Sequence, residues 1–249
     1  MTETGSAQLR DDYEQRYDSG ERDSARLGRW RALCAEGKAD HVAELVRALP
    51  EDPALVLEVG CGDGGLLCAL AARGVGERRE GVDISARAVE LASQRPEIAS
   101  VQRFDGTTLP YDDEVFQLGV LSHVLEHVPD PAPLLAEAAR VCRAVVVEVP
   151  LEDNRSASRA SVERGREELG HLHRFSRTDV RELAARTRLR VAGELADPLP
   201  AAIHTFWADG LAARSTALAK AALRRRLFAA APAAAERSFT VHYACLLVP

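Results

Sequence analysis

Short apolar segments alternate with longer amphipathic ones along most of the chain. Residues 54–59 are apolar, precede a run of glycines, and are too few and too β-branched to form a helix. Such a segment predicts a strand that is buried on both faces. Similar segments follow four times before residue 150 and twice after residue 188. They predict strands at residues 81–84, 100–104, 115–121, 144–149, 189–195 and 239–248.

Amphipathic patterns predict helices between these strands. Ser85 can cap one of them, and Ser176 with Asp179 three residues later has the spacing of a capping box. Steady alternation of strand and helix predicts right-handed βαβ units around a parallel sheet, which places the chain in the α/β class. The expected helices cover residues 65–73, 85–95, 131–142 and 176–186.

The remaining segments extend this alternating core. Residues 8–50 are polar and helix-prone, with apolar side chains at helical spacing over residues 40–49. Residues 151–170 are polar and predict a surface connection, and residues 198–236 predict an alanine-rich helical insertion. The expected organisation is a helical cap, the α/β core, a substrate-capping helical insertion and a final strand that completes the core sheet. These segments span residues 1–50, 51–196, 197–237 and 238–249.

The composition is that of an ordinary globular protein that can bury a sizeable core, with 46% hydrophobic and 28% charged residues. Lys and Arg number 32 against 38 Asp and Glu, and the formal net charge of −6 offers no general attraction for nucleic acid or an anionic membrane. No signal-peptide pattern or apolar run of bilayer length occurs, so we expect a cytoplasmic protein. The five cysteines include no C-x-x-C pair, which favours reduced thiols over disulfides or a thiolate zinc site.

A glycine-rich loop between the first strand and the first core helix predicts a cofactor site. Gly60, Gly62 and Gly64 allow a tight turn with positive φ, and the N-terminus of the following helix favours negative charge. A small anionic or nucleoside-bearing cofactor is therefore expected. Gly60 and Gly62 also fit the dinucleotide pattern G-x-G-x-x-G together with Gly65, so the loop leaves nicotinamide and other adenosine cofactors open.

Two aspartates follow the next strands. Asp83 ends the second strand, where a carboxylate can accept both hydroxyls of a ribose, and Asp105 ends the third strand. Ligands of open α/β sheets bind outside the carboxyl ends of the strands, where these residues lie. The fourth strand then leads into residues 122–130, which are Ser-His-Val-Leu-Glu-His-Val-Pro-Asp.

These motifs together resemble the class I methyltransferases that use S-adenosylmethionine. The similarity is strongest to the small-molecule branch, of the Methyltransferase domain 11 type, which has the pattern v-l-E-H-v-p-d after its fourth strand. The resemblance covers about residues 54–195. The first motif of that family, E/D-x-G-x-G-x-G, is matched by residues 58–64, and the acidic end of its second strand is matched by Asp83.

The resemblance implies a Rossmann-like sheet of seven mostly parallel strands with helices on both faces. The last strand would be antiparallel and lie between the fifth and the sixth. It also implies S-adenosylmethionine as the cofactor and S-adenosylhomocysteine as the product. The ribose would be bound by Asp83, the adenine by Asp105 with Gly106, and the methionine part would lie beside Ser122 and His123. The full set of implied cofactor contacts is Glu58, Gly60, Cys61, Gly62, Gly64, Asp83, Ile84, Asp105, Gly106, Ser122 and His123.

The implied reaction is methyl transfer to an oxygen or nitrogen atom of a small molecule by in-line displacement, which requires alignment of the acceptor. A hydroxyl or protonated amine also needs a base, and histidine suits that role near neutral pH. Residues 170–176, Gly-His-Leu-His-Arg-Phe-Ser, are similar to a segment of this branch that lies where the substrate approaches. We therefore assign His171 or His173 as the general base. We expect a small-molecule acceptor, and neither nucleic acid nor a membrane as a partner.

Three other interpretations stay open. The glycine loop permits an NAD(P)-dependent oxidoreductase, although no proton relay of the Ser-Tyr-Lys type is apparent. A catalytically silent module that only binds the cofactor is the second. The third is a zinc hydrolase, because His123, Glu126 and His127 fit H-x-x-E-H, whose histidines must share one helix face. This motif begins directly after a strand and meets Pro129, so we expect no metal.

Overall fold

The computed structural model describes residues 21–157 and 170–249. Parts of two predicted segments, the N-terminal cap over residues 1–20 and the polar connection over residues 158–169, lie outside the described residues.

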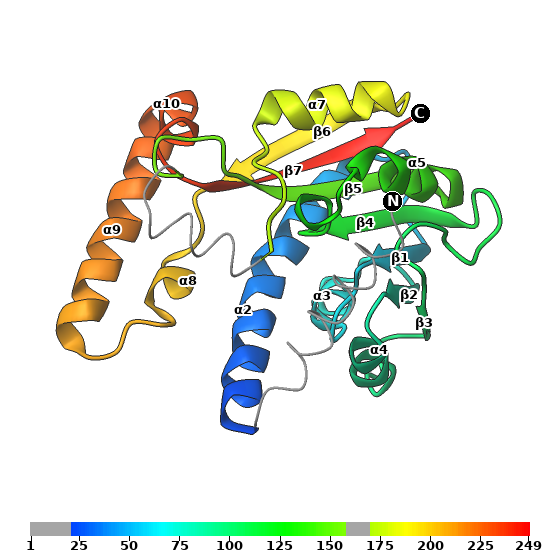
Figure 1. Cartoon of the computed structure of the whole chain (residues 1–249), viewed down its shortest axis with the longest axis horizontal. Coiled ribbons are helices and arrows are strands. Elements are labelled where there is room, and N and C mark those ends of the chain that lie inside the picture. Colours follow the sequence, from blue (N-terminus) through cyan, green and yellow to red (C-terminus); the bar gives the residue numbers. More distant parts are fainter. Residues whose placement is uncertain (1–20, 158–169) are drawn as a thin grey trace.

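Among the described residues, seven strands form one sheet in the order β3-β2-β1-β4-β5-β7-β6 (Figure 1). Neighbouring strands from β3 to β5 are parallel, whereas β7 is antiparallel to both β5 and β6. The predicted Rossmann-like sheet, with its last strand antiparallel between the fifth and sixth, is therefore confirmed. The strands are β1 (Leu55–Val59), β2 (Arg78–Asp83), β3 (Ser100–Arg103), β4 (Phe116–Ser122), β5 (Cys142–Leu151), β6 (Arg190–Asp197) and β7 (Val241–Val248).

Helices cover both faces of the sheet (Figure 1). Val146 of β5 packs with α2 and α3 on one face, whereas Val145 and Val147 pack with α5 and α7 on the other. Side chains alternate along a strand with a period of two, so a central strand covered on both faces has an almost continuous apolar sequence. The helices are α2 (Glu21–Leu45), η1 (Val46–Ala48), α3 (Gly65–Ala72), α4 (Ala86–Ser93), η2 (Leu125–His127), α5 (Pro131–Val141), α7 (Arg177–Arg186), α8 (Ala201–Thr205), α9 (Leu211–Ala230) and α10 (Pro232–Glu236).

Polar caps set the predicted helix starts. The Ser85 hydroxyl accepts a hydrogen bond from the amide of Ala88 over 3.1 Å at the start of α4. At the start of α7, Ser176 accepts a bond from the amide of Asp179, whose carboxylate accepts one from the amide of Ser176. These bonds satisfy amides that lack a partner in the helix backbone. The capping box predicted from the sequence is confirmed.

Three segments differ in extent from their sequence patterns. α2 has 25 residues, so the amphipathic pattern over residues 40–49 marks only its end. β5 continues to Leu151 because its last residues pair with β7. The alanine-rich segment forms three helices, with Gly210 before α9 and Pro232 at the start of α10. Within the described ranges, no helix has the length and apolar character needed to cross a membrane.

Candidate active site

The candidate site lies at the carboxyl ends of the parallel strands, around the point where the strand order reverses between β1 and β4. The loops that follow β1, β2, β3 and β4 line a cavity of about 480 Å³ there. This volume is in the ordinary range for small-molecule sites. Ten of the eleven cofactor-contact residues expected from the sequence line the cavity, namely Glu58, Gly60, Cys61, Gly62, Asp83, Ile84, Asp105, Gly106, Ser122 and His123.

The glycine loop is held against the end of β2 by its own backbone. The amides of Gly60 and Cys61 both donate to the carbonyl of Val82, over 2.8 and 3.0 Å. Gly60 has a φ of +76°, and a Cβ atom placed on it would lie 2.6 Å from Cγ2 of Val124. A side chain there would force the Val124 side chain to shift, so both conformation and space favour glycine. The bare backbone leaves this wall of the cavity open to close approach by a ligand.

Gly64, unlike Gly60 and Gly62, lies away from the cavity. It precedes α3 with a φ of +78°, and a Cβ atom on it would lie 2.4 Å from Cδ1 of Ile98 and 3.3 Å from Cβ of Ala92. It is not among the residues that line the cavity. The geometry therefore indicates a packing role for Gly64, where the start of α3 meets α4 and the residues after it.

Asp83, at the end of β2, orders two neighbouring loops. Its Oδ2 atom accepts a hydrogen bond from the amide of Gly62 over 2.8 Å, and Oδ1 accepts one from the amide of Ser85 over 2.9 Å. The residue is buried but lines the cavity. A carboxylate fixed beside the glycine loop presents acceptor oxygens to a ligand, which recognition of ribose hydroxyls requires.

Glu58 brings a buried carboxyl group to the cavity wall. Its Oε2 atom has no hydrogen-bond partner in the described part of the chain. Burial raises the pKa of Glu58 well above its ordinary value; Lys38 partly offsets this rise, and Asp83 adds to it. A buried polar atom without a protein partner calls for an explanation, and a ligand that hydrogen-bonds to it provides one. Together with the cavity shape left by Gly60, this atom fits the expected cofactor.

Asp105 stands two residues after β3, beside Gly106. Its Oδ1 atom accepts hydrogen bonds from the amides of Thr107 and Thr108, both over 2.7 Å, and from the Thr107 hydroxyl over 2.8 Å. Burial would raise the pKa of Asp105, but these bonds outweigh it and lower that pKa. The carboxylate is therefore ionised and held in one orientation at the cavity.

The two histidines assigned as candidate bases differ in position. His171 lines the cavity, and its Nδ1 atom lies 2.9 Å from Oε2 of Glu152, which follows β5. His173 is not among the residues that line the cavity, and a ring nitrogen, Nε2, donates to the carbonyl of Val128 over 2.8 Å. Of this pair, the structure therefore brings His171 to the site and leaves His173 outside it.

The H-x-x-E-H segment does not adopt the arrangement of a zinc hydrolase. Its centre is η2, a single 3-10 turn of three residues, so His123 and His127 do not share the face of an α-helix. Nδ1 of His127 instead lies 3.1 Å from the carbonyl oxygen of Gly170.

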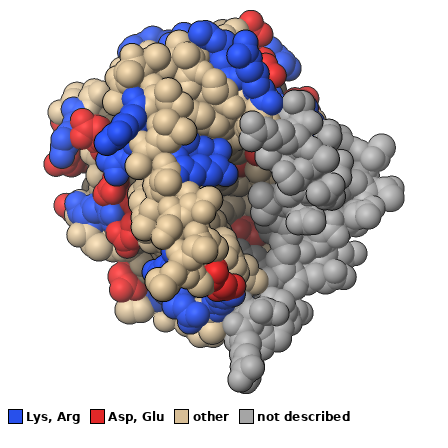
Figure 2. Space-filling model, turned by 90° about the vertical axis from the view of Figure 1, so that its left-hand side faces the viewer, with Lys and Arg blue, Asp and Glu red and all other residues tan. Residues whose placement is uncertain are grey.

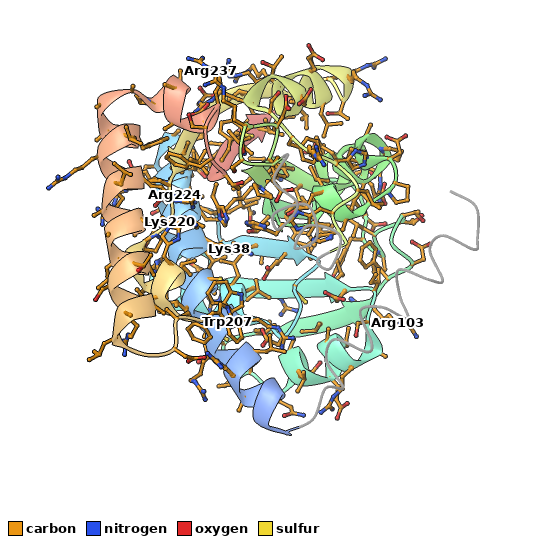
Figure 3. The ribbon with its side chains drawn as sticks, turned by 60° about the vertical axis from the view of Figure 1, so that its left-hand side comes forward. Lys38, Arg103, Trp207, Lys220, Arg224 and Arg237 are labelled. Carbon is orange, nitrogen blue, oxygen red and sulfur yellow. The ribbon has the colours of Figure 1, made fainter. Side chains whose placement is uncertain are left out.

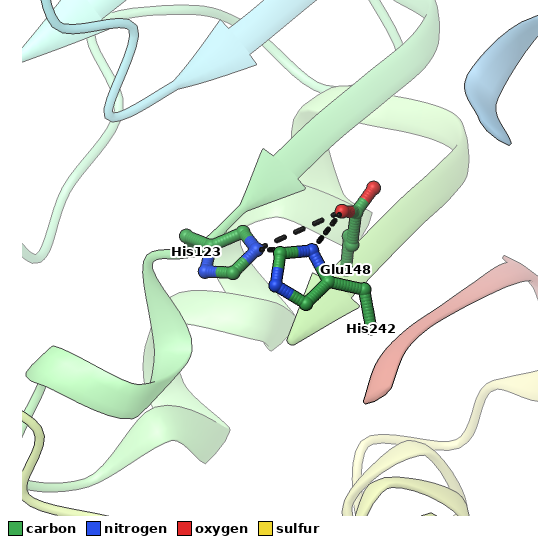
Figure 4. Close-up of side chains that lie close together, drawn as sticks. All are labelled: His123, Glu148 and His242. Carbon is green, nitrogen blue, oxygen red and sulfur yellow. Dashed lines mark hydrogen bonds and ion pairs between the residues drawn. The ribbon is translucent and has the colours of Figure 1, made fainter. Parts of the chain in front are cut away.

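A buried cluster of histidines and carboxylates adjoins the cavity. Two of its histidines, His123 and His242, line the cavity, and of these the sequence analysis identified only His123. His123 follows β4, Glu148 lies within β5 and His242 lies within β7 (Figure 4). Nε2 of His123 is 3.3 Å from Nδ1 of His242 and 3.6 Å from Oε1 of Glu148. Nδ1 of His242 is 3.3 Å from the same oxygen. We refer to His123, Glu148 and His242 as the His–Glu–His cluster.

Further side chains surround this cluster and fix its charge. Nδ1 of His123 lies 3.0 Å from Oε1 of Glu126, and Nδ1 of His41 lies 3.3 Å from Oε2 of Glu148. Burial alone would raise the pKa of Glu148, but the three surrounding histidines lower it well below its ordinary value. Burial, with the charge of His123, lowers the pKa of His242 to about 4. At neutral pH, Glu148 is thus ionised and His242 is neutral.

Glu148 and His242 belong to no motif, which is why sequence analysis missed them. Each interrupts an otherwise apolar run, over residues 144–149 and 241–248. A charge buried in such a strand needs a partner, so the interruptions were the available signal. The missing information was the pairing of β5 with β7, which sets His242 opposite Pro150 and close to Glu148.

α2 forms a further wall of the cavity. Its side chains Trp30, Arg31 and Lys38 line the cavity. Phe206 and Trp207, just after α8, pack on Trp30 with ring centroids 5.1 and 5.7 Å away. None of residues 198–236, all of which the structure describes, lines the cavity itself. The insertion therefore reaches the cavity through Trp30.

Cationic side chains gather between α2 and α9. Figure 3 shows Lys38 of α2 together with Lys220 and Arg224 of α9 in this region. On the face drawn in Figure 2, Lys and Arg side chains border a recess in which Asp and Glu side chains are visible. This face offers both signs of charge to an approaching ligand.

Residues 57–145 match a family model described as Methyltransferase domain. Among curated proteins, the chain is similar to a ubiquinone biosynthesis O-methyltransferase of Thiobacillus denitrificans (strain ATCC 25259 / T1). The two are 35% identical over 94 residues, which cover 35% of this chain and 39% of that protein. The matched regions span less than half the length of the curated relatives.

Two solved structures illustrate the likeness in fold. One is geranyl diphosphate C-methyltransferase from Streptomyces coelicolor A3(2) in complex with Mg²⁺, geranyl diphosphate and S-adenosyl-L-homocysteine. It is 17% identical with a TM-score of 0.60, over 85% of this chain and 77% of that chain. The other is Haemonchus contortus Phospholethanolamine N-methyltransferase 2, 14% identical with a TM-score of 0.62, over 96% of this chain and 59% of that chain. At these identities the likeness concerns the fold.

Proposed function

We propose that this chain, which carries a class I S-adenosylmethionine-dependent methyltransferase domain, transfers a methyl group to an oxygen or nitrogen atom of a small molecule. One observation carries the proposal: the Gly62 amide donates to the Asp83 carboxylate at the wall of a cavity outside the carboxyl ends of the strands. This bond supports the proposal because it joins the glycine loop to the acidic end of β2, the two features that a nucleoside cofactor needs in such a sheet.

Each part of the cofactor has candidate partners in this proposal. Asp83 accepts the ribose hydroxyls, and Asp105 with the Gly106 amide binds the adenine edge. The loop at Gly60 and the unpartnered Oε2 atom of Glu58 face the methionine end. The positive end of α3, which begins just after the loop, favours the carboxylate of the methionine part.

Bound S-adenosylmethionine would supply a methyl group that its sulfonium sulfur already activates. The remaining task of the chain is to align the acceptor with that methyl group and to exclude water. Ser122 at the end of β4 and His123 directly after it, the residues expected beside the methionine part, line the cavity together with Trp30 of α2, and we place the acceptor next to them.

His171 is the proposed general base for an acceptor that must lose a proton. Glu152, 2.9 Å from Nδ1, holds the proton on that nitrogen and orients the ring, so Nε2 is the basic atom. The His171 side chain is only 7% exposed, which limits competition from bulk water. The proposal therefore keeps His171 and sets His173 aside.

The lining of this cavity indicates the class of acceptor, whereas the similar proteins differ from one another in the atom that they methylate. The similar proteins described above are named as O-, C- and N-methyltransferases. The cavity of about 480 Å³ suits a nucleoside with a small molecule beside it, and its polar wall at His123, Glu152 and His171 suits an acceptor with a hydroxyl or amine.

Calorimetric titration of the purified chain with S-adenosylhomocysteine, S-adenosylmethionine and NADH tests the proposal. We expect micromolar binding of the first two and none of NADH. Binding of NADH alone would instead support a nicotinamide oxidoreductase. A panel of hydroxyl and amine acceptors, assayed by formation of S-adenosylhomocysteine, then tests turnover. Cofactor binding without turnover across the panel would favour a silent binding module.

A further inference from the structure

We propose that the His–Glu–His cluster binds a divalent transition-metal ion of the Zn²⁺ type, and that this ion holds the hydroxyl group of the methyl acceptor. The inference rests on the proposed function and narrows it, because it selects oxygen over nitrogen as the methylated atom. It assigns a role to Glu148 and His242, which the proposed function leaves unused.

The distances between the three ligand atoms are the strongest support for the proposal. Nε2 of His123, Nδ1 of His242 and Oε1 of Glu148 form a triangle with sides of 3.3, 3.3 and 3.6 Å. Bonds of about 2.0–2.1 Å to a tetrahedral ion set its ligand atoms about 3.3–3.4 Å apart, whereas octahedral neighbours at that length are about 2.9 Å apart. The triangle therefore matches one face of a tetrahedral site. Two imidazoles and one carboxylate also suit Zn²⁺ better than Ca²⁺ or Mg²⁺, which prefer oxygen ligands.

The carboxylate oxygen of the cluster is the second observation. Glu148 is 1% exposed, and its Oε1 atom has no hydrogen bond of acceptable geometry in the described part of the chain, although two imidazole nitrogens lie nearby. A buried carboxylate oxygen that faces two ring nitrogens without accepting a hydrogen bond from either is poorly satisfied by the protein alone. A cation at the centre of the triangle would satisfy it.

Outer partners hold the three ligands in place. Nδ1 of His123 lies 3.0 Å from Oε1 of Glu126, so its other nitrogen, Nε2, is turned into the cluster. Oε2 of Glu148 lies 3.3 Å from Nδ1 of His41, whose Nε2 is 3.6 Å from Oδ2 of Asp197. Imidazole and carboxylate ligands of metal sites are commonly oriented by such second partners.

The cluster also has an open side. His123 and His242 line the same cavity as Gly60 and Ser122, whereas Glu148 closes the cluster from the interior. A catalytic zinc site has three protein ligands and one position for water or substrate. Here that fourth position faces the cavity where we place the acceptor.

Electron counting explains why the metal would select oxygen. An amine that binds a metal uses its one lone pair and has none left to attack a methyl group. A hydroxyl on the metal loses its proton, which passes to His171 or to solvent, and the oxygen keeps a lone pair beyond the one it shares with the ion. That pair forms the O–CH₃ bond, while the electrons of the S–CH₃ bond remain on sulfur and leave a neutral thioether. The ion is neither oxidised nor reduced.

Titration of the tag-free, chelator-treated chain with Co²⁺ tests the metal site without any turnover. Tetrahedral Co²⁺ absorbs visible light far more strongly than octahedral Co²⁺, so the spectrum reports both binding and geometry. We expect saturation at one equivalent, strong absorption bands, and their loss on addition of Zn²⁺. Weak bands of an octahedral ion, or no saturation near one equivalent, would overturn the proposal.

Two variants and one matched control locate the ion. His242→Gln and Glu148→Gln remove a ligand with little change in size, and we expect at least about 100-fold weaker Co²⁺ binding, since loss of an outer partner alone costs roughly 10–100-fold. His173→Gln removes a histidine that lies outside the cavity, and its Co²⁺ binding should match the parent chain. Thermal unfolding in metal-free buffer shows which ligand variant is folded, and either one suffices. Undiminished Co²⁺ binding in a folded ligand variant would refute the assignment.

Titration with S-adenosylhomocysteine separates this proposal from the proposed function. A parent chain that binds S-adenosylhomocysteine but not Co²⁺ keeps the proposed function and loses the metal site. A parent chain that binds neither S-adenosylhomocysteine nor Co²⁺ would contradict both the proposed function and the metal site.

Discussion

The amide of Gly62 donates to Oδ2 of Asp83 over 2.8 Å, and this bond ties the loop after β1 to the end of β2. The Asp83 carboxylate is thereby held in the cavity in the orientation that the ribose requires in our proposal. The loop and the carboxylate are therefore expected to act as one unit in cofactor binding, although 21 residues separate them in the sequence.

We predict that Asp83→Ala weakens S-adenosylhomocysteine binding about 10- to 100-fold. Hydrogen bonds to a charged group contribute about 1.5–3 kcal/mol, and the loss of the loop anchor acts in the same direction. Calorimetric titration measures the change. Asp112→Ala, at an exposed position before β4, is the matched control and should bind like the parent chain. Equal affinity in the parent and Asp83→Ala chains would remove Asp83 from the cofactor site.

We predict that Gly64→Ala destabilises the fold by about 2–3 kcal/mol. The left-handed backbone costs a residue with a Cβ atom about 1–2 kcal/mol, and the tight approach to Ala92 at 3.3 Å adds about 1 kcal/mol of overpacking, whereas the terminal methyl group of Ile98 can shift. Urea unfolding measures the difference. Gly74 has a similar φ of +71° but nothing within 4 Å of its Cβ position, so Gly74→Ala isolates the backbone cost. If both variants lose the same stability, the packing role of Gly64 is wrong.

We predict that His171→Ala lowers kcat about 100- to 10,000-fold with the acceptor that the panel identifies, the usual range for loss of a general base. The affinity for S-adenosylhomocysteine should stay the same, since His171 is placed on the acceptor side. Leu172→Ala, in the same segment but 56% exposed, is the control. A loss of turnover in His173→Ala and not in His171→Ala would reverse the assignment.

We predict that Glu58→Gln raises the free energy of unfolding above about pH 5. Burial raises the pKa of Glu58 in the folded chain well above the value near 4.5 of an unfolded one. Between these values the folded state binds more protons, so this group makes stability fall as pH rises, by up to about 1.4 kcal/mol per pH unit. The contribution of Glu58 to the free energy of unfolding is fully present below its pKa in the unfolded chain. It is lost as the pH rises towards its pKa in the folded chain.

Urea unfolding of the parent and Glu58→Gln chains at pH 5, 6, 7 and 8 measures this effect. The gap between them should widen with pH, because an amide cannot ionise. Glu77→Gln, at an exposed position before β2, should show a constant gap near zero. A gap that stays constant for Glu58→Gln would show that Glu58 ionises as readily in the folded chain as in the unfolded one.

Local chemistry explains why so much of the core fold could be predicted. The apolar segments 54–59 and 144–149 lie at the centre of the sheet, where both faces are covered, so composition alone marks them as strands. The caps at Ser85 and Ser176 act within three residues of themselves, so their spacing is visible in the sequence. The early turns of α2 lack a strong amphipathic pattern, and its full length was not apparent.

In the candidate site, too, the residues that could be predicted are those whose positions depend on local sequence. Residues of the glycine loop and Asp83 follow consecutive strands, and parallel strands bring their carboxyl ends together without further information. Glu148 and His242 meet only because β7 returns antiparallel beside β5, across 94 residues of chain. The positions of His171 and His173 depended on which side of one segment faces the cavity, and neighbouring loops decide that.

The place of β7 also has a consequence for the order in which the protein can form during synthesis. β6 has no partner in the sheet except β7, and β7 is the last of the seven described strands to leave the ribosome. The parallel strands β1 to β5 can associate earlier, since domains form from their N-terminal side as the chain emerges. Until residues 241–248 follow, β5 keeps an open edge, β6 has no partner in the sheet, and His242 is absent. Of the seven described strands, the last to be made is therefore the one that covers the open edge of β5 and completes the His–Glu–His cluster.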